Sequence, residues 1–89
     1  MNTYHYTPSG VCSRGIEIEL DGDRIVSVRF QGGCSGNTQG VAALVAGMSV
    51  EEAIRRLSGI RCGMRPTSCP DQLSKALAAA LAKEKQQTV

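Results

Sequence analysis

Four cysteines in a short chain with few large apolar residues constrain what this sequence can fold into. Cys12, Cys34, Cys62 and Cys69 are spread through 89 residues, which hold no Trp, one Phe and two Tyr. Small apolar side chains each bury little area, so the hydrophobic core is near the lower limit for a domain that folds alone. Domains of this size commonly add a disulfide, a metal or a partner subunit. The cysteines are the candidates for that constraint.

The start of the sequence indicates the cellular compartment, and the compartment decides which cysteine chemistry to expect. Residues Met1 to Tyr6 are polar and aromatic and lack the apolar region of a secretory signal, and no stretch is long enough to span a membrane. We therefore expect a cytoplasmic protein with no membrane partner. Disulfides are rare in the cytoplasm, so metal binding or thiol redox chemistry is expected before a disulfide framework.

The charges and the polar motifs exclude several classes of function. The net charge is +2, and the basic residues are scattered without interleaved aromatic residues, which argues against nucleic-acid binding. The sole histidine, His5, is expected on the surface, so no Ser/His/Asp triad is predicted. The glycine-rich run 32–36 lacks the Lys-Ser/Thr ending of a phosphate-binding loop. We expect no catalysis by this chain alone.

Alternating apolar and polar residues predict three strands, over Thr3–Thr7, Ile16–Leu20 and Arg24–Phe30. The Asp21-Gly22 pair predicts a hairpin turn between the last two, because glycine accepts positive φ without strain. The alternation places one apolar set on the core face: Ile16, Ile18 and Leu20 in the second strand, and Val26, Val28 and Phe30 in the third.

Helical spacing predicts three helices after the strands, over Ser35–Ala46, about 50–57 and Asp71–Glu84. The first helix is expected to bury Val41, Leu44 and Val45 and to end before Gly47. The second is expected to begin with a capping box of Ser49 and Glu52. Ser68 or Cys69 is the expected N-cap of the third. Strands followed by helices imply an α+β fold. We expect one domain over residues 1–89, a three-stranded antiparallel sheet with three helices packed on one face.

All four cysteines fall in predicted loops or caps, beside glycine or proline. Alternate loops of an antiparallel meander meet at one end of the sheet, and the N-termini of helices can be brought to that end, where they stabilise thiolates. No Cys-x2-Cys pair is present, so the spacing alone is weak support for a metal. Cysteines packed separately as small apolar residues are the alternative, and their loop positions fit it poorly.

We therefore predict that Cys12, Cys34, Cys62 and Cys69 bind one zinc ion or one iron–sulfur cluster. Both use four thiolates, so the ligand set leaves the two open. Arg14, Arg61 and Arg65 would offset the negative charge of such a site.

Residues Thr67-Ser68-Cys69-Pro70-Asp71 spell the motif that names the TSCPD domain family. The resemblance covers nearly the whole chain, from the Cys12 loop to the last helix. Members of that family are small stand-alone proteins or C-terminal modules of adenosylcobalamin-dependent ribonucleotide reductases. The resemblance implies metal binding through cysteines and a ribonucleotide reductase as a partner.

A second, more distant resemblance is to iron–sulfur scaffold proteins of the NifU and IscU type. It rests on four segments of the chain, 28–34, 47–53, 60–62 and 73–81. The first is a strand that ends in Gly-Cys, and the last resembles the terminal helix of the scaffolds. The resemblance implies the same α+β fold and matches Cys12, Cys34 and Cys62 with the three scaffold cysteines. Cys69 adds a fourth thiolate that the scaffolds lack. A closed site of four ligands favours stable binding over cluster transfer.

Two other functions remain open. In the first, Cys62 and Cys69 cycle between dithiol and disulfide, and the chain is a thiol-redox or electron-delivery module that supports a ribonucleotide reductase. In the second, the chain is an interaction domain whose Ala-rich last helix, with Ala76 and the run 78–80, pairs with another subunit, for example as a homodimer.

Overall fold

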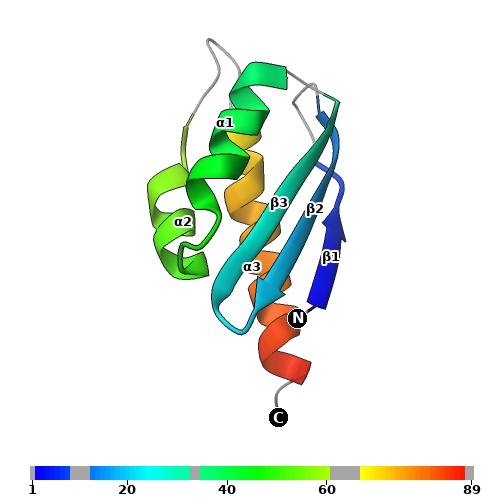
Figure 1. The fold of residues 1–89 in the computed structure, drawn as a ribbon, viewed down its shortest axis with the longest axis vertical. Coiled ribbons are helices and arrows are strands. Elements are labelled where there is room, and N and C mark those ends of the chain that lie inside the picture. Colours follow the sequence, from blue (N-terminus) through cyan, green and yellow to red (C-terminus); the bar gives the residue numbers. More distant parts are fainter. Residues whose placement is uncertain (1, 9–12, 33–34, 61–66, 88–89) are drawn as a thin grey trace.

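The computed structural model describes residues 2–8, 13–32, 35–60 and 67–87 of the chain. Three strands are followed by three helices, as the sequence predicts (Figure 1). The elements are β1 (Asn2–Tyr6), β2 (Ser13–Asp21), β3 (Arg24–Gly32), α1 (Ser35–Val45), α2 (Val50–Leu57) and α3 (Cys69–Gln87). The α+β fold with an antiparallel sheet is therefore confirmed.

The sheet is an antiparallel meander in the order β1-β2-β3. One cross-strand row joins Tyr4, Ile18 and Val28, and all three are buried under the helices. The row beside it joins His5, Glu17 and Arg29 on the opposite face, where His5 and Arg29 are exposed. The period of two thus gives this sheet one apolar and one polar face.

A bulge in β3 changes the core face that the alternation predicts. Glu19 pairs with Ser27 but the next residue, Leu20, pairs with Ile25, so Val26 is the extra residue on β3. Val26 was expected in the core and is 38% exposed, while Ile25 takes the buried position. A bulge shifts the alternation by one residue, which the apolar pattern of 24–30 does not reveal.

The helices cover one face of the sheet, with α1 on β3 and α3 on β2 and β1, and α2 packs against α3 (Figure 1). Helix α1 was expected to bury Leu44, but that side chain is 76% exposed, whereas Val45 is buried. Helix α3 buries its apolar stripe in the core, and this stripe includes Ala76 and Ala80. A homodimer through the Ala-rich helix stays a prediction.

The link between α1 and α2 covers the start of β3. The Ile25 amide donates to the Met48 carbonyl at 2.9 Å, and the Gly47 amide donates back to the Ile25 carbonyl at 2.7 Å. Ser49 is the N-cap of helix α2, and its hydroxyl accepts the amide of Glu52 at 3.2 Å. The Glu52 carboxylate does not close the expected capping box, because it binds Arg55 and Arg56 instead.

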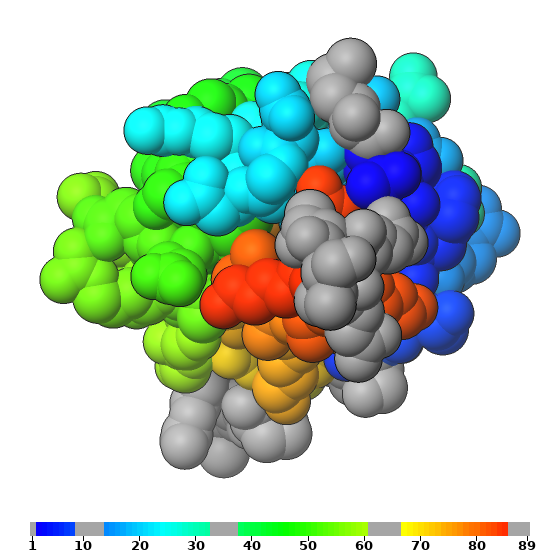
Figure 2. Space-filling model, turned by 90° about the horizontal axis from the view of Figure 1, so that it is seen from below, coloured from blue at the N-terminus to red at the C-terminus, as the bar shows by residue number. Residues whose placement is uncertain are grey.

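A buried carboxylate fixes the far end of α3 to the sheet. Glu84 is 6% exposed and accepts the Tyr4 hydroxyl, the Asn2 side-chain amide at 2.9 Å and the Gly22 backbone amide at 3.1 Å. Figure 2 looks at this end and shows the last turns of α3 beside the β2–β3 turn and β1. The C-terminal part of α3 is thereby fixed to the hairpin-turn end of the sheet.

These contacts also set the charge states. The Tyr4 hydroxyl, followed by the Asn2 amide, holds the pKa of Glu84 below its usual range. Burial, followed by the Glu84 carboxylate, raises the pKa of Tyr4 to about 12.

Helix α1 carries a glycine that its surroundings do not require. Gly40 lies mid-helix, is exposed, and has no atom within 4 Å of a Cβ built on it. We expect Gly40→Ala to raise the free energy of unfolding by about 1 kcal/mol, because alanine loses less backbone entropy in a helix. Urea unfolding measures this. The control is Gly22→Ala, which should lower stability because Gly22 has a φ of +63°. A destabilising Gly40→Ala would contradict the structure of α1.

Glu84 should make the fold sensitive to acid. Because its pKa is lower in the folded chain than in the unfolded one, its contribution is complete above the unfolded value, about 4.3, and is lost as pH falls through the folded value. We expect Glu84→Gln to flatten the fall in thermal midpoint below about pH 5. Glu51→Gln removes an exposed carboxylate of α2 and should leave that slope unchanged. Equal slopes for Glu84→Gln and the wild type would contradict the assignment.

Candidate functional site

Three of the four predicted ligands, Cys12, Cys34 and Cys62, lie outside the described residues. Cys69 is described: it is the first residue of α3 and is 6% exposed. Its side chain counts among the buried apolar residues of the structure. Within the described ranges, no group of three or more His, Cys, Asp or Glu side chains could hold a metal ion. The four-cysteine site therefore stays a prediction.

The described residues next to the cysteines in sequence gather at one end of the sheet. Ser13, which follows Cys12, pairs with Gly32, which lies two residues before Cys34. Gly32 has a φ of +79°, a conformation that favours glycine, at the point where β3 ends. The start of β2, the end of β3 and the start of α1 all lie toward the upper end of Figure 1.

The N-terminus of α3 points to the same end. Glu84 fixes the other end of this helix to the β2–β3 turn. From Glu84 back to Cys69 the helix rises roughly 22 Å, and β2 spans roughly 26 Å from its turn to Ser13. Cys69 therefore lies toward the end where β2 begins and β3 finishes, in agreement with Figure 1.

A cation lies at this end of the sheet. The Arg14 side chain lies beside Gly32: its Nε is 3.3 Å from the position that a Cβ on Gly32 would take. Arg14 was expected to offset the charge of thiolates, and this position is consistent with that role. The other two expected cations, Arg61 and Arg65, lie outside the described residues.

The first turn of α3 is capped by Ser68. Its hydroxyl accepts the Asp71 amide at 3.1 Å, and its carbonyl accepts the Gln72 amide at 2.8 Å. The sequence leaves Ser68 and Cys69 open as the N-cap, and the structure shows that it is Ser68. Cys69 and Pro70 take the first two helical positions, where a backbone N–H has no partner within the helix and proline costs nothing.

A buried polar network surrounds this cap. Asp71 accepts the Thr67 hydroxyl at 2.5 Å and the Gly59 amide at 2.7 Å. The Thr67 hydroxyl also accepts the Gln72 side-chain amide at 3.0 Å, and the Ser68 hydroxyl donates to the Ile60 carbonyl at 2.6 Å. The Thr67 hydroxyl, followed by the Gly59 amide, stabilises the Asp71 carboxylate and holds its pKa below its usual range.

The network uses three residues of the Thr67–Asp71 motif for structure, which the sequence analysis did not foresee. The sequence predicted Ser68 or Cys69 as the N-cap but no hydrogen-bond partner for the side chains of Thr67 and Asp71. The Ser-x-x-Asp pattern over 68–71 is an N-cap signal that could have located the cap. The bonds to Gly59 and Ile60 have no local signal, because their partners lie 12 and 8 residues away.

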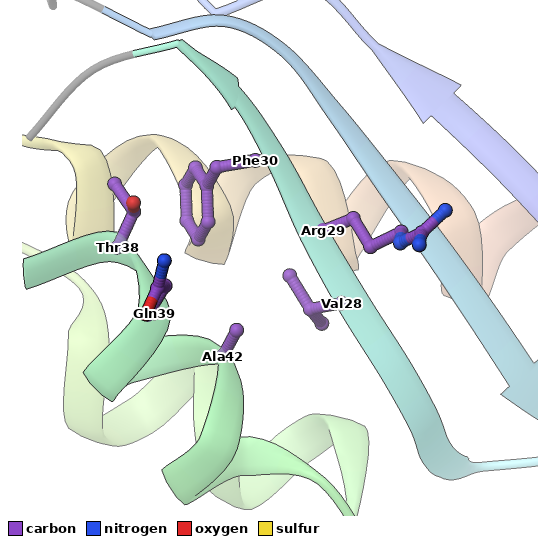
Figure 3. A pocket seen from close by; sticks show the side chains of 6 residues that line it. All are labelled: Val28, Arg29, Phe30, Thr38, Gln39 and Ala42. Atoms are coloured by element: carbon purple, nitrogen blue, oxygen red, sulfur yellow. The ribbon is translucent and has the colours of Figure 1, made fainter. Parts of the chain in front are cut away.

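A groove of about 200 Å³ lies between α1 and β3, not far from this end (Figure 3). Val28 and Phe30 of β3 face Thr38 and Ala42 of α1 across it, and Arg29 points away toward the other face of the sheet. Among the described residues, its lining holds no thiol or carboxylate. We assign no chemistry to this groove.

Comparisons with known proteins identify one family. The family model described as the TSCPD domain matches residues 1–81 of the chain. No curated protein and no solved structure matches it. The resemblance to NifU- and IscU-type scaffolds is not shown and stays a prediction. Among the described helices, none is long and apolar enough to cross a membrane.

The Ser68 hydroxyl should contribute more to stability than an ordinary N-cap. Ser68→Ala removes this partner both from the Asp71 amide, in a buried bond, and from the Ile60 carbonyl, in a part-buried one. We expect the free energy of unfolding to fall by about 2 kcal/mol. Ser49→Ala at the N-cap of α2 loses one such bond and should cost about 1 kcal/mol. Denaturant unfolding compares them, and an equal or smaller cost at Ser68 would contradict the double role.

Proposed function

Because the chain belongs to the TSCPD domain family, we propose that it holds one zinc ion or one iron–sulfur cluster on Cys12, Cys34, Cys62 and Cys69. One observation carries the proposal: the chain segments that adjoin these cysteines gather at one end of the sheet. Ser13 and Gly32 are register partners there, and the N-terminus of α3 lies toward the same end. This arrangement of the neighbouring segments supports a common site for cysteines that are far apart in sequence.

The surroundings of Cys69 suit a thiolate ligand. It occupies the first position of a helix of 19 residues, where free amides and the helix dipole favour a negative charge. Its side chain is 6% exposed, so a charge on the sulfur would be shielded from water. Arg14 supplies a positive charge at the same end of the sheet. A zinc ion with four thiolate ligands would contribute folding free energy here rather than catalysis.

The partner that we propose is a ribonucleotide reductase, because domains of this family occur with these enzymes. The chain would serve as an accessory metal-binding module without catalysis of its own. In the thiol-redox alternative, Cys69 would exchange with an external thiol or disulfide. Exchange requires access to the sulfur, and Cys69 is 6% exposed, which favours the metal-binding role.

The test is metal analysis of protein purified without oxygen, beside single Cys→Ser variants at all four positions. We expect about one zinc per chain in colourless protein, or iron and sulfide with visible absorbance in brown protein. Each substitution should lower metal content and thermal midpoint together, because the free energy of metal binding is also folding free energy. The control is Ser27→Ala, on the exposed face of β3, which should change neither.

Three results would change this assignment. Metal-free wild-type protein whose four cysteine variants melt alike would refute metal binding. Full occupancy in Cys69→Ser, with loss in the other three variants, would indicate a three-cysteine site of the scaffold type. If metal-loaded protein exchanged thiols freely with thioredoxin, the redox alternative would replace the proposal.

A further inference from the structure

We infer that Thr67, Ser68 and Asp71 are positioning residues, which clamp the end of α2 to the start of α3 and so set the separation of Cys62 and Cys69. We define the clamp as the two hydrogen bonds from residues 59–60 to residues 67–71, with the bonds that brace them. Its consequence for metal binding rests on the proposed function, but the clamp itself does not.

Two hydrogen bonds cross between the segments. The Gly59 amide donates to one oxygen of Asp71 at 2.7 Å, and the Ser68 hydroxyl donates to the Ile60 carbonyl at 2.6 Å. Asp71 is 7% exposed, so water competes little for its carboxylate. A hydrogen bond to a charged group is stronger than one between neutral groups. Residues 59–60 are therefore held directly against the first turn of α3.

Further bonds brace the clamp from within. The second oxygen of Asp71 accepts the Thr67 hydroxyl at 2.5 Å, and that hydroxyl accepts the Gln72 side-chain amide. Every buried side-chain nitrogen and oxygen among the described residues has a partner. The carboxylate therefore cannot rotate away from Gly59 without depriving the buried Thr67 hydroxyl of its acceptor, which costs free energy.

The clamp closes the base of a short loop. Ile60 and Thr67 are separated by six residues in sequence; Cys62 follows Ile60 by two residues, and Cys69 follows Thr67 by two. Cys62 lies outside the described residues, but the covalent chain limits its distance from Ile60. Holding Ile60 and Thr67 together limits how far apart Cys62 and Cys69 can lie along the covalent chain, which raises the effective concentration of one thiol near the other.

A structural role alone would look different from a positioning role, and the chain offers a matched control. Asp71 and Glu84 are both buried carboxylates on α3, 7% and 6% exposed, with several donors each. They lie at opposite ends of the helix, roughly 20 Å apart. Asp71→Asn and Glu84→Gln should both destabilise the fold, but only Asp71→Asn should loosen the clamp.

The first measurement needs no metal. In a chain with Cys12→Ser and Cys34→Ser, Cys62 and Cys69 are equilibrated with reduced and oxidised glutathione. Oxidised glutathione takes up two electrons and is released as two thiols when the Cys62–Cys69 disulfide forms, with overall loss of two protons from the protein thiols. The fraction of disulfide at equilibrium gives the effective concentration of the pair.

We expect Asp71→Asn and Thr67→Val to lower that effective concentration at least about tenfold, whereas Glu84→Gln changes it less than about twofold. Thr67→Ser keeps the hydroxyl and should restore a value near that of the parent chain. Circular dichroism confirms which variants are folded under the assay conditions. If Asp71→Asn fails to fold, the effective concentrations in Thr67→Val and Thr67→Ser test the clamp instead, and equal values in the two variants would contradict it.

The second measurement uses the full chain with its four cysteines and Zn²⁺ or Co²⁺ alone. We expect Asp71→Asn to weaken the apparent affinity about tenfold more than Glu84→Gln does, at a temperature where both are folded. Disulfide and affinity values that shift equally in the two carboxylate variants would overturn the positioning role. A wild-type chain that binds no metal would refute the proposed function, and the disulfide measurement would still decide the clamp.

Discussion

The two buried carboxylates of helix α3 need hydrogen-bond donors, and this need fixes the helix against the sheet and against α2. The helix contacts β1, β2, α1 and α2. An ionised carboxylate leaves water only when hydrogen-bond donors replace it. Glu84 accepts hydrogen bonds from β1 and the hairpin turn. Asp71 accepts hydrogen bonds from Gly59, just after α2, and from Thr67. The helix is therefore held to the sheet at one end and to its neighbouring helix at the other.

Most of the architecture could be predicted from local patterns. The alternation over 16–20, the Asp21-Gly22 turn and the helical spacing after Leu73 each depend on neighbours within a few residues, and all three are confirmed. Gly47 ends α1 with a φ of +84°, as expected of a glycine that follows a helix. Local signals of this kind determine the elements and, through their order, the fold class.

The remainder depends on contacts that no short window of sequence contains. The bulge at Val26 arises from pairing across two strands, and Leu44 is exposed because α1 presents Val41, Ala42 and Val45 to the core instead. The network around Asp71 joins residues that are as much as 12 positions apart. For the candidate site, the sequence predicted the cysteines near the ends of elements, which the structure describes for Cys69 alone, and the structure adds the capping network beside Cys69.

The two ends of the described chain share one side of the molecule. Asn2 is hydrogen-bonded to Glu84 in the last part of α3, so both ends lie at the hairpin-turn end of the sheet (Figure 1). Any polypeptide that continued from either end would emerge opposite the side on which the cysteine-flanking segments gather. Fusion of this unit to a larger protein would therefore leave that side accessible to a docking surface, with the linker on the far side out of the way.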